Sequence, residues 1–285
     1  MWVMGKSQKT NGLWMMQKGE FEQSVSDLER AIVAEGGNPR QLFDLFRTDK
    51  DYTKRIARMM LRRGLKSSIA VKIARLVLGR NVFDDADWMS YYDANLSKKL
   101  IRAVAEFPWS DELLNSPCPF NTDKLVKDTH FAFFGLPSLN GKALTVLGWH
   151  DIHPATGQPK FYFNQDPWYK GEGYANKAVC EARWYLLLKD IVPGSTDKMP
   201  EEQEKMLPPE YEIPTTIAEV TKDILCFRKT DVRVNPSRWA HCKEKTSDGF
   251  LSCVGHFAAC GLYVSIWDGS RYYYIGVGAS RKLPS

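Results

Sequence analysis

The chain has 285 residues, of which 26% are charged and 44% are hydrophobic, and its formal net charge is +5. This length suffices for one large or two ordinary domains, and the composition is typical of a soluble globular protein. The small net charge does not by itself indicate a nucleic-acid-binding protein. The sequence contains no apolar run of about eighteen residues and no signal peptide, so we expect no membrane span and a cytoplasmic location.

The N-terminal part of the chain has the periodicity of α-helices. Apolar residues recur at helical spacing in 21–34, 42–46, 49–63 and 67–78, and again after Ser97. Glycines and capping residues separate these segments. In the fourth segment, Ile69, Ile73, Leu76 and Val77 are expected to face inward. The pattern predicts a helical bundle over residues 1–115 as a separate N-terminal domain.

The same segment is locally basic. A run of this kind is typical of a solvated helix face, and the alternative is contact with nucleic acid or an acidic partner. No interleaved aromatic residues or known motif favour the alternative. The basic residues are Lys54, Arg55, Arg58, Arg62, Arg63, Lys66, Lys72, Arg75 and Arg80.

From residue 116 onward the sequence becomes richer in proline, glycine and aromatic residues. Strands are predicted at 130–134, 143–148 and 160–164, followed by a buried helix over 175–191. The polar stretch 195–212 predicts no regular element. We therefore expect a second, α+β domain over residues 116–285.

A helix is predicted from Thr216, because Glu219 three residues later completes a capping box. Three short strands punctuated by glycines follow at 250–257, 261–267 and 272–279. Along the middle strand the side chains alternate between two faces. The core-facing set is Leu262, Val264 and Ile266, joined by Ile275 and Val277, and the opposite set is Tyr263, Ser265 and Trp267.

The window from Thr246 to Tyr274 contains no Lys, Glu, Gln or Met. These four types make up roughly a fifth of the chain, so about five would be expected there by proportion. Every residue type in the window except Trp267 can be encoded by a codon ending in C or T. Adenine-directed randomisation of AAC-type codons would produce this set of residue types, with Trp267 as a fixed position. The alternative is that β-strands avoid Lys, Glu and Gln.

The cysteines and histidines do not form a recognisable catalytic or metal-binding pattern. Six cysteines without a CxxC pair indicate free thiols in a reducing compartment. Cys253 and His256 lie three residues apart on a predicted strand, so we expect them on opposite faces. No glycine-rich phosphate loop is present. We expect no metal, no cofactor and no enzymatic activity.

Five short segments of the sequence resemble known proteins. Residues 213–220, IPTTIAEV, resemble a helix start of the formylglycine-generating branch of the C-type lectin fold. Residues 275–282, IGVGASRK, resemble the last strand of variable proteins of diversity-generating retroelements. The segments PCPF at 117–120, THFAF at 129–133 and HPATGQP at 153–159 are similar to uncharacterised bacterial proteins of this type. The resemblance covers about residues 117–285.

In that family a reverse transcriptase copies a template with errors at adenines, and the copy replaces the 3′ end of the target gene. The resemblance therefore implies a C-type lectin-like domain over 116–285, with short antiparallel strands, two helices and a variable region at about 246–274. It implies a binding protein for an unknown protein or other macromolecule. A simpler interpretation of the tyrosines is that they merely cover a strand face. The expected ligand-binding residues are Cys253, His256, Cys260, Tyr263, Ser265, Ser270, Arg271, Tyr272, Tyr273 and Tyr274.

A second hypothesis belongs to another functional class. The chain would be a nucleic-acid-associated or adaptor protein that acts through its basic helical segment. A reverse transcriptase gene and an adenine-rich near-repeat beside the gene would favour the first hypothesis over the second.

Overall fold

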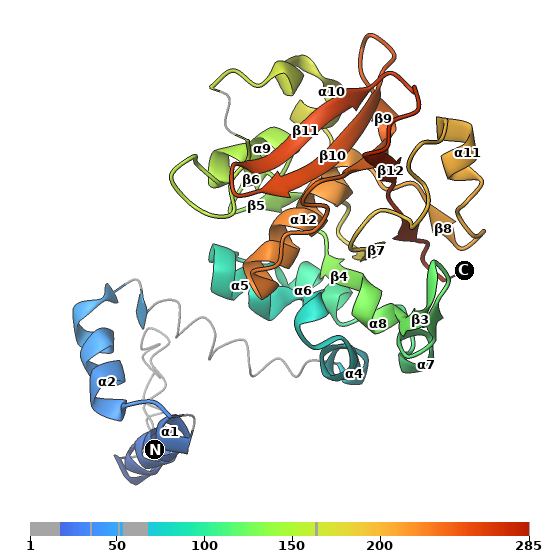
Figure 1. Cartoon of the computed structure of the whole chain (residues 1–285). Coiled ribbons are helices and arrows are strands. Elements are labelled where there is room, and N and C mark those ends of the chain that lie inside the picture. The colour runs from blue at the N-terminus through green and yellow to red at the C-terminus, as the bar shows by residue number, and fades with distance from the viewer. Residues whose placement is uncertain (1–17, 35, 51, 54–67, 163–164, 285) are drawn as a thin grey trace, which may run out of the picture. The chain divides into compact units, whose positions relative to one another are not determined.

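The computed structural model describes residues 18–34, 36–50, 52–53, 68–162 and 165–284 (Figure 1). The chain divides into two compact units between Met60 and Leu61. The described residues combine helices with small, mainly antiparallel sheets, so the predicted α+β class is confirmed at that level.

The first unit contains a pair of helices, α1 (Lys18–Ala34) and α2 (Pro39–Thr48). The Asn38 side chain caps α2 by accepting hydrogen bonds from the backbone N–H groups of Arg40 and Gln41. None of the α2 side chains is fully buried. The predicted helices at 21–34 and 42–46 are confirmed, whereas most of the predicted helix at 49–63 lies outside the described residues.

The second unit is built around two sheets. The first has the strand order β1-β4-β7-β13-β8, in which β1 runs parallel to β4 and the other pairs are antiparallel. All side chains of β4 and β7 are buried, so this sheet lies inside the unit. Its strands are β1 (Val82–Phe83), β4 (His130–Phe134), β7 (Trp184–Leu188), β8 (Tyr211–Glu212) and β13 (Ser280–Arg281).

The second sheet has the order β11-β10-β9-β12. Its first three strands form an antiparallel meander, and β12 joins β9 in parallel. Two small hairpins, β2 with β3 and β5 with β6, lie outside both sheets. The bounds are β9 (Trp239–Lys245), β10 (Leu251–Ala258), β11 (Gly261–Trp267), β12 (Ile275–Val277), β2 (Pro117–Cys118), β3 (Asn121–Leu125), β5 (Ser138–Leu139) and β6 (Lys142–Ala143).

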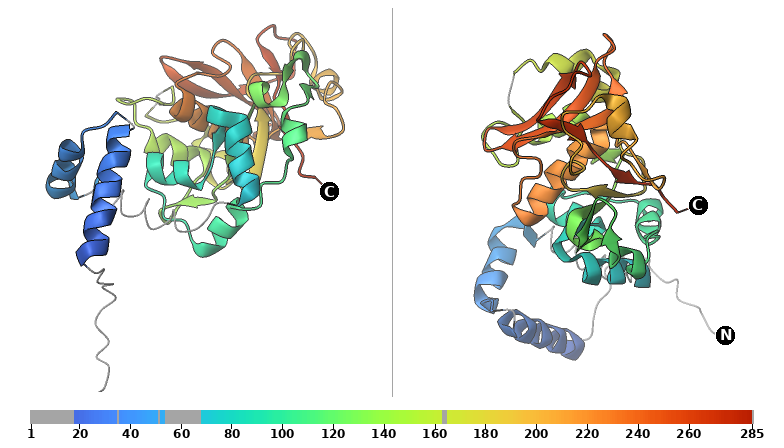
Figure 2. Two further views of the ribbon diagram at one scale, coloured as in Figure 1. Left: turned by 90° about the horizontal axis from the view of Figure 1, so that it is seen from below. Right: turned by 45° about the vertical axis from the view of Figure 1, so that its right-hand side comes forward.

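Helix α12 (Thr216–Thr230) lies between the two sheets. It packs against β4 and β7 of the first sheet and against β9 and β10 of the second (Figures 1 and 2). Twelve of its fifteen residues are buried, so it is the centre of the core. The remaining helices are α4 (Ile69–Leu78), η1 (Gly79–Asn81), α5 (Asp85–Tyr92), α6 (Lys98–Val104), α7 (Asp111–Leu114), α8 (Val126–Thr129), α9 (Val146–Ile152), η2 (Trp168–Gly171), α10 (Gly173–Asn176) and α11 (Pro200–Glu204).

A charged cluster lies inside α12. The fully buried Lys222 donates hydrogen bonds to Glu219 Oε1 at 2.5 Å and to the Lys189 carbonyl at 2.8 Å, and its Nζ lies 3.1 Å from Asp223 Oδ1. Burial raises the pKa of the Asp223 carboxyl well above its usual value, although Lys222 opposes the shift. Glu219 therefore pairs with Lys222 and does not close the predicted capping box. Thr215 caps the helix instead, by accepting from the Ala218 N–H group.

Helices α4 to α7 belong to the second unit. The Trp184 indole donates to the Val104 carbonyl at 2.9 Å, and the Trp88 indole donates to the Phe134 carbonyl at 2.8 Å. Residues 69–115 therefore share a core with the C-terminal part of the chain, whereas the sequence prediction grouped them with residues 1–60. Helical periodicity identifies a face that must be buried, but it does not identify the element that covers it.

The buried face of α4 also differs from the expectation. Val71, Ala74 and Leu78 are buried, whereas Ile69 is 77% exposed and Leu76 is 84% exposed. This helix is apolar on most sides, so its sequence alone does not specify which side faces the core.

Several predicted elements are confirmed and others are corrected. Strand β4 has the predicted bounds 130–134. The predicted helix at 175–191 is wrong over most of its length: only its first two residues belong to a helix, α10, and 184–188 form the buried strand β7, because a short apolar run is ambiguous between helix and strand. The predicted strand at 143–148 is mainly helix α9, which Thr145 caps through the Gly148 N–H group. The stretch 195–212 contains α11 and β8.

Candidate functional site

The second sheet has two chemically different faces. The inner face points toward α12, and its residues Val254, Phe257 and Leu262 belong to the main core. The outer face carries Trp239, Cys253 and Tyr263 from three adjacent strands. The registers Gly255↔Trp239, Gly255↔Tyr263 and Cys253↔Ser265 bring these outer-face positions together.

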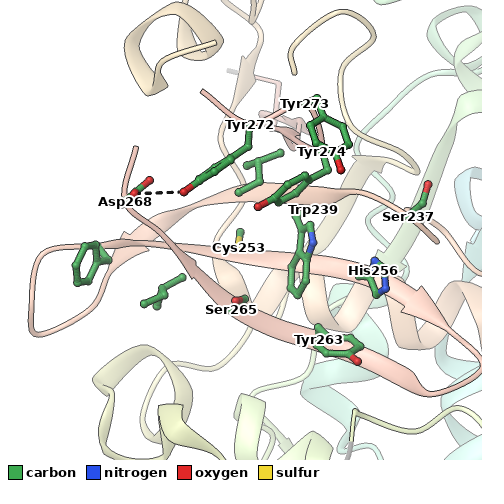
Figure 3. Close-up of a pocket in the computed structure, with 13 residues that line it drawn as sticks. Ser237, Trp239, Cys253, His256, Tyr263, Ser265, Asp268, Tyr272, Tyr273 and Tyr274 are labelled. Atoms are coloured by element: carbon green, nitrogen blue, oxygen red, sulfur yellow. Dashed lines mark hydrogen bonds between the residues drawn. The ribbon is translucent and has the colours of Figure 1, made fainter. Parts of the chain in front are cut away.

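A pocket of about 880 Å³ lies on the outer face (Figure 3). Strands β9, β10 and β11 form its floor, and the chain between β11 and β12 forms one wall. We call residues 268–274 the tyrosine loop. The pocket is lined by Ser237, Trp239, Phe250, Cys253, His256, Tyr263, Ser265, Ile266, Asp268, Tyr272, Tyr273, Tyr274 and Ile275.

Seven of the thirteen lining residues carry aromatic rings. Tyr272 and Tyr274 stack with ring centroids 5.2 Å apart, and Tyr273 meets Tyr274 edge to face at 5.0 Å. On the floor, Trp239 stacks on His256 at 5.9 Å and meets Tyr263 edge to face at 5.5 Å. These rings offer broad contact area with few rotatable bonds, which suits a recognition surface.

Trp267 and Asp268 fix the start of the tyrosine loop. The buried Trp267 indole donates to the Ser270 carbonyl at 2.7 Å, and Asp268 Oδ1 accepts from the Ser270 N–H group at 2.9 Å. The Tyr272 hydroxyl donates to Asp268 Oδ2 at 3.4 Å. The negative charge of Asp268 raises the pKa of the Tyr272 hydroxyl.

A bulge in β10 places His256 in the pocket. The pairing register shifts between Gly255 and Ala258, with φ values of +152° at Gly255 and +46° at His256. A Cβ atom at Gly255 would overlap the Arg238 carbonyl oxygen, so this close approach requires glycine. Cys253 and His256 therefore both line the pocket, and the expectation of opposite faces was wrong.

The Cys253–His256 arrangement does not resemble an activated nucleophile. Cys253 is buried, and burial raises the pKa of its thiol. Among the described residues, no hydrogen bond joins this thiol to His256. A cysteine nucleophile needs such a base within reach, with a third group to orient it.

Seven of the ten predicted site residues line the pocket. They are Cys253, His256, Tyr263, Ser265, Tyr272, Tyr273 and Tyr274. The other three lie outside it: Cys260 is exposed at the β10–β11 turn, Ser270 is exposed in the tyrosine loop, and Arg271 binds Glu202 at 2.8 Å.

The sequence did not identify several pocket residues. Trp239 belongs to β9, a strand that was not predicted, and Asp268 follows β11 directly. Ile266 was expected in the core but is 42% exposed and lines the pocket, whereas Trp267 is 1% exposed. Ile266 lies at the end of β11, which is the edge strand of the second sheet.

The basic run of the N-terminal part is only partly described. Lys54, Arg55, Arg58, Arg62, Arg63 and Lys66 lie outside the described residues. Of the remainder, Arg75 pairs with Asp84 and Asp85, and Arg80 donates to the Lys229 carbonyl. The described arginines of this run are thus engaged within the chain.

Other site types find no support in the part of the chain that the structure describes. There, no three His, Cys, Asp or Glu side chains converge as metal ligands, and no helix has both the length and the apolar character to cross a membrane. The six cysteines are unpaired. Comparisons with protein-family models, curated proteins and solved structures gave no match.

Proposed function

We propose that this protein binds a macromolecular ligand in the outer-face pocket, and that retroelement mutagenesis diversifies the pocket residues. One observation carries the proposal. Ten of the thirteen lining residues come from the window 246–274, which lacks Lys, Glu, Gln and Met. The stretch of unusual composition and the cavity therefore coincide.

Trp267 supports the codon interpretation. It is the residue of the window whose codon cannot end in C or T, so it must be a fixed position if the window is diversified. In the structure it is buried, and its indole holds the tyrosine loop through the Ser270 carbonyl. A position that stays constant among variable ones is expected to have a structural role, and the buried Trp267 has such a role because it anchors the tyrosine loop.

Strand propensity explains the missing residue types only in part. Lys, Glu and Gln are depleted in strands, but they are ordinary in exposed turns and loops. The window includes the turn 246–250, the turn at 259–260 and the tyrosine loop, none of which is strand. The depletion continues through these segments, which favours a cause at the level of the gene.

The scaffold suits this function. We propose that residues 116–285 have a C-type lectin-like arrangement, in which α12 supports the short sheet β11-β10-β9-β12 and the terminal strand β13 returns to the first sheet. The display face would then stand on a buried helix and on strands fixed by their inner-face packing. Rigid elements of this kind hold recognition side chains in place at little entropic cost.

Sequencing the DNA that flanks the gene tests the proposal. We expect an open reading frame for a reverse transcriptase and a near-copy of the 3′ coding end. Differences between the two copies should fall at adenines of the near-copy and map to pocket codons, with the Trp267 codon unchanged. The absence of any near-copy in the flanking DNA would refute diversification by this route.

A further inference from the structure

The pocket combines aromatic rings with one carboxylate. Asp268 is the only Asp or Glu among the lining residues, and no Lys or Arg side chain lines the cavity. Aromatic rings present negative faces, so a ring-lined cavity with a carboxylate attracts cations. The chain as a whole has a net charge of +5, so this negative character is local.

Asp268 has capacity for another partner. Its oxygens accept from the Ser270 N–H group and from the Tyr272 hydroxyl, which leaves lone pairs of the carboxylate available. Within the described residues no cation forms an ion pair with it. Arg271 binds Glu202 and the Asp197 carbonyl, and Lys243 and Lys245 line a neighbouring depression that Asp268 also borders.

We propose that this pocket binds an arginine side chain presented by a loop of the partner polypeptide; the proposal rests on the binding function proposed above. A guanidinium is planar, stacks on aromatic faces and pairs with a carboxylate through two parallel hydrogen bonds. Asp268 provides the carboxylate, and the adjacent Tyr272 and Tyr274 provide ring faces (Figure 3). The cavity of about 880 Å³ admits a drug-sized group, so an inserted loop fits it better than a flat surface.

An anionic ligand does not fit the same site. A carboxylate or phosphate would meet the charge of Asp268 and the negative ring faces, with no Lys or Arg side chain in the lining to offset them. The phenol of Tyr272 is already directed to Asp268, so its hydrogen is not free for an incoming anion. Charge complementarity therefore selects a cationic partner group.

Titration with three small probes tests the inference. N-acetylarginine amide, its neutral isostere N-acetylcitrulline amide and N-acetylglutamate amide would be added to the full chain. The indole N–H signal of Trp239 would be followed by NMR, with Trp239→Phe used for its assignment. We expect saturable binding of the arginine probe, at least about five-fold weaker binding of the citrulline probe and no shift with the glutamate probe. Equal binding of the arginine and citrulline probes, or preference for glutamate, would overturn the inference.

A matched pair of variants locates the charge effect. Asp268→Asn keeps the acceptor for the Ser270 N–H group, so the loop should stay folded, but the negative charge is removed. We expect its affinity for the arginine probe to fall about five-fold, to the level of citrulline. Asp248→Asn makes the same change at an exposed turn outside the pocket and should leave the affinity unaltered. Unchanged arginine affinity in Asp268→Asn would contradict the proposal.

Failure of this inference differs from failure of the proposed function. If a near-copy with adenine-linked differences flanks the gene but arginine and citrulline bind equally, the pocket is diversified and its ligand is not cationic. If the flanking DNA holds no near-copy but arginine binds selectively, the pocket is an arginine site of an ordinary binding protein.

Discussion

The two faces of the second sheet are formed by the same strands but differ in how they are packed. On the inner face, Val254, Leu262 and Val264 are buried in the main core against α12. On the outer face, Tyr263 and Ser265, which alternate with those residues along β11, are half-buried around a cavity of about 880 Å³. The inner face is packed along its length, whereas the outer face has an open cavity beside a small buried cluster of Cys253, Trp267 and Ile275.

This difference shows how a single strand can be both fixed scaffold and adaptable surface. Because side chains alternate with a period of two, a residue can change on one face without disturbing its neighbours on the other. Interiors are close-packed, so inner-face positions tolerate little change, whereas an open pocket has room for many side chains. Substitutions on the two faces should therefore differ in their cost.

The largest effect is expected at the centre of the inner face. Val264→Asp would bury a carboxylate without a partner and should lower the free energy of unfolding by about 4 kcal/mol or more. The control is Ser265→Asp, one residue along β11 and half-buried in the pocket, which should cost no more than about 1 kcal/mol. Urea denaturation of both variants measures the contrast, and similar losses would remove the distinction between the faces.

The charged cluster of α12 binds the end of β7 in the first sheet through Lys222 and should be nearly as sensitive. Lys222→Met leaves Glu219 and Asp223 buried without their cation, so we expect a loss of about 3–5 kcal/mol in the free energy of unfolding. Lys205→Met, at an exposed position after α11, is the matched control and should change stability little. A loss below about 1 kcal/mol for Lys222→Met would mean that the cluster does not hold the helix in place.

The pH dependence of stability tests the packing of His241 on the outer face. His241 lies under Trp267, and burial lowers its pKa to about 4, although Glu201 opposes the shift. Because the unfolded chain binds this proton near the ordinary pKa of about 6.5, the stability from neutral His241 is present above that pH. It should be lost as pH falls toward 4, at up to about 1.4 kcal/mol per pH unit.

The variant His241→Asn isolates this residue, because other buried histidines add to the same trend; burial lowers the pKa of His130 to about 3 and that of His153 to about 4. In thermal melts between pH 7 and pH 4, the stability of the variant should decline less steeply as the pH falls. The difference in slope should correspond to about one proton fewer taken up on unfolding. An unchanged slope would indicate that water reaches His241 under the loop.

The smallest effect is expected at the rim of the pocket. Tyr273 is 80% exposed, so Tyr273→Ser should alter the free energy of unfolding by about 0.5 kcal/mol or less. Tyr272→Ser removes the stacked contact with Tyr274, so it should cost somewhat more than Tyr273→Ser and far less than Val264→Asp. Thermal melts of both variants check this order, and a loss comparable to that of Val264→Asp would make the tyrosines structural.

The strands with clear alternation could be predicted from the sequence. Strand β11 has the expected bounds 261–267, because its apolar and polar residues alternate over most of its length. Strand β9 was not predicted, because its buried Ala240 and Cys242 lie among lysines and a glutamate that suggest a surface segment. The helix expected at 175–191 failed because apolar residues on all sides suit a central strand equally well.

The pocket was predictable only from residues within the compositionally unusual window. Tyr263, Ser265 and the three loop tyrosines were identified because large polar side chains on a strand face serve no core. Trp239 reaches the same cavity through strand pairing with β10, which no local pattern reveals. The β10 bulge also depends on the Arg238 carbonyl, which accepts from the His256 N–H group and is distant in sequence. The joint placement of Cys253 and His256 therefore could not be foreseen.

The most direct measurement is deep sequencing of the codons for residues 230–285 in many independent copies of the gene from one population. The account predicts that substitutions concentrate at outer-face codons, such as those of Tyr263, Ser265 and Tyr273. Codons of Val264 and Trp267, which are buried, should be nearly invariant. Substitutions spread evenly over both faces, or an invariant pocket beside variation elsewhere, would contradict the claim that this face is a diversified binding surface.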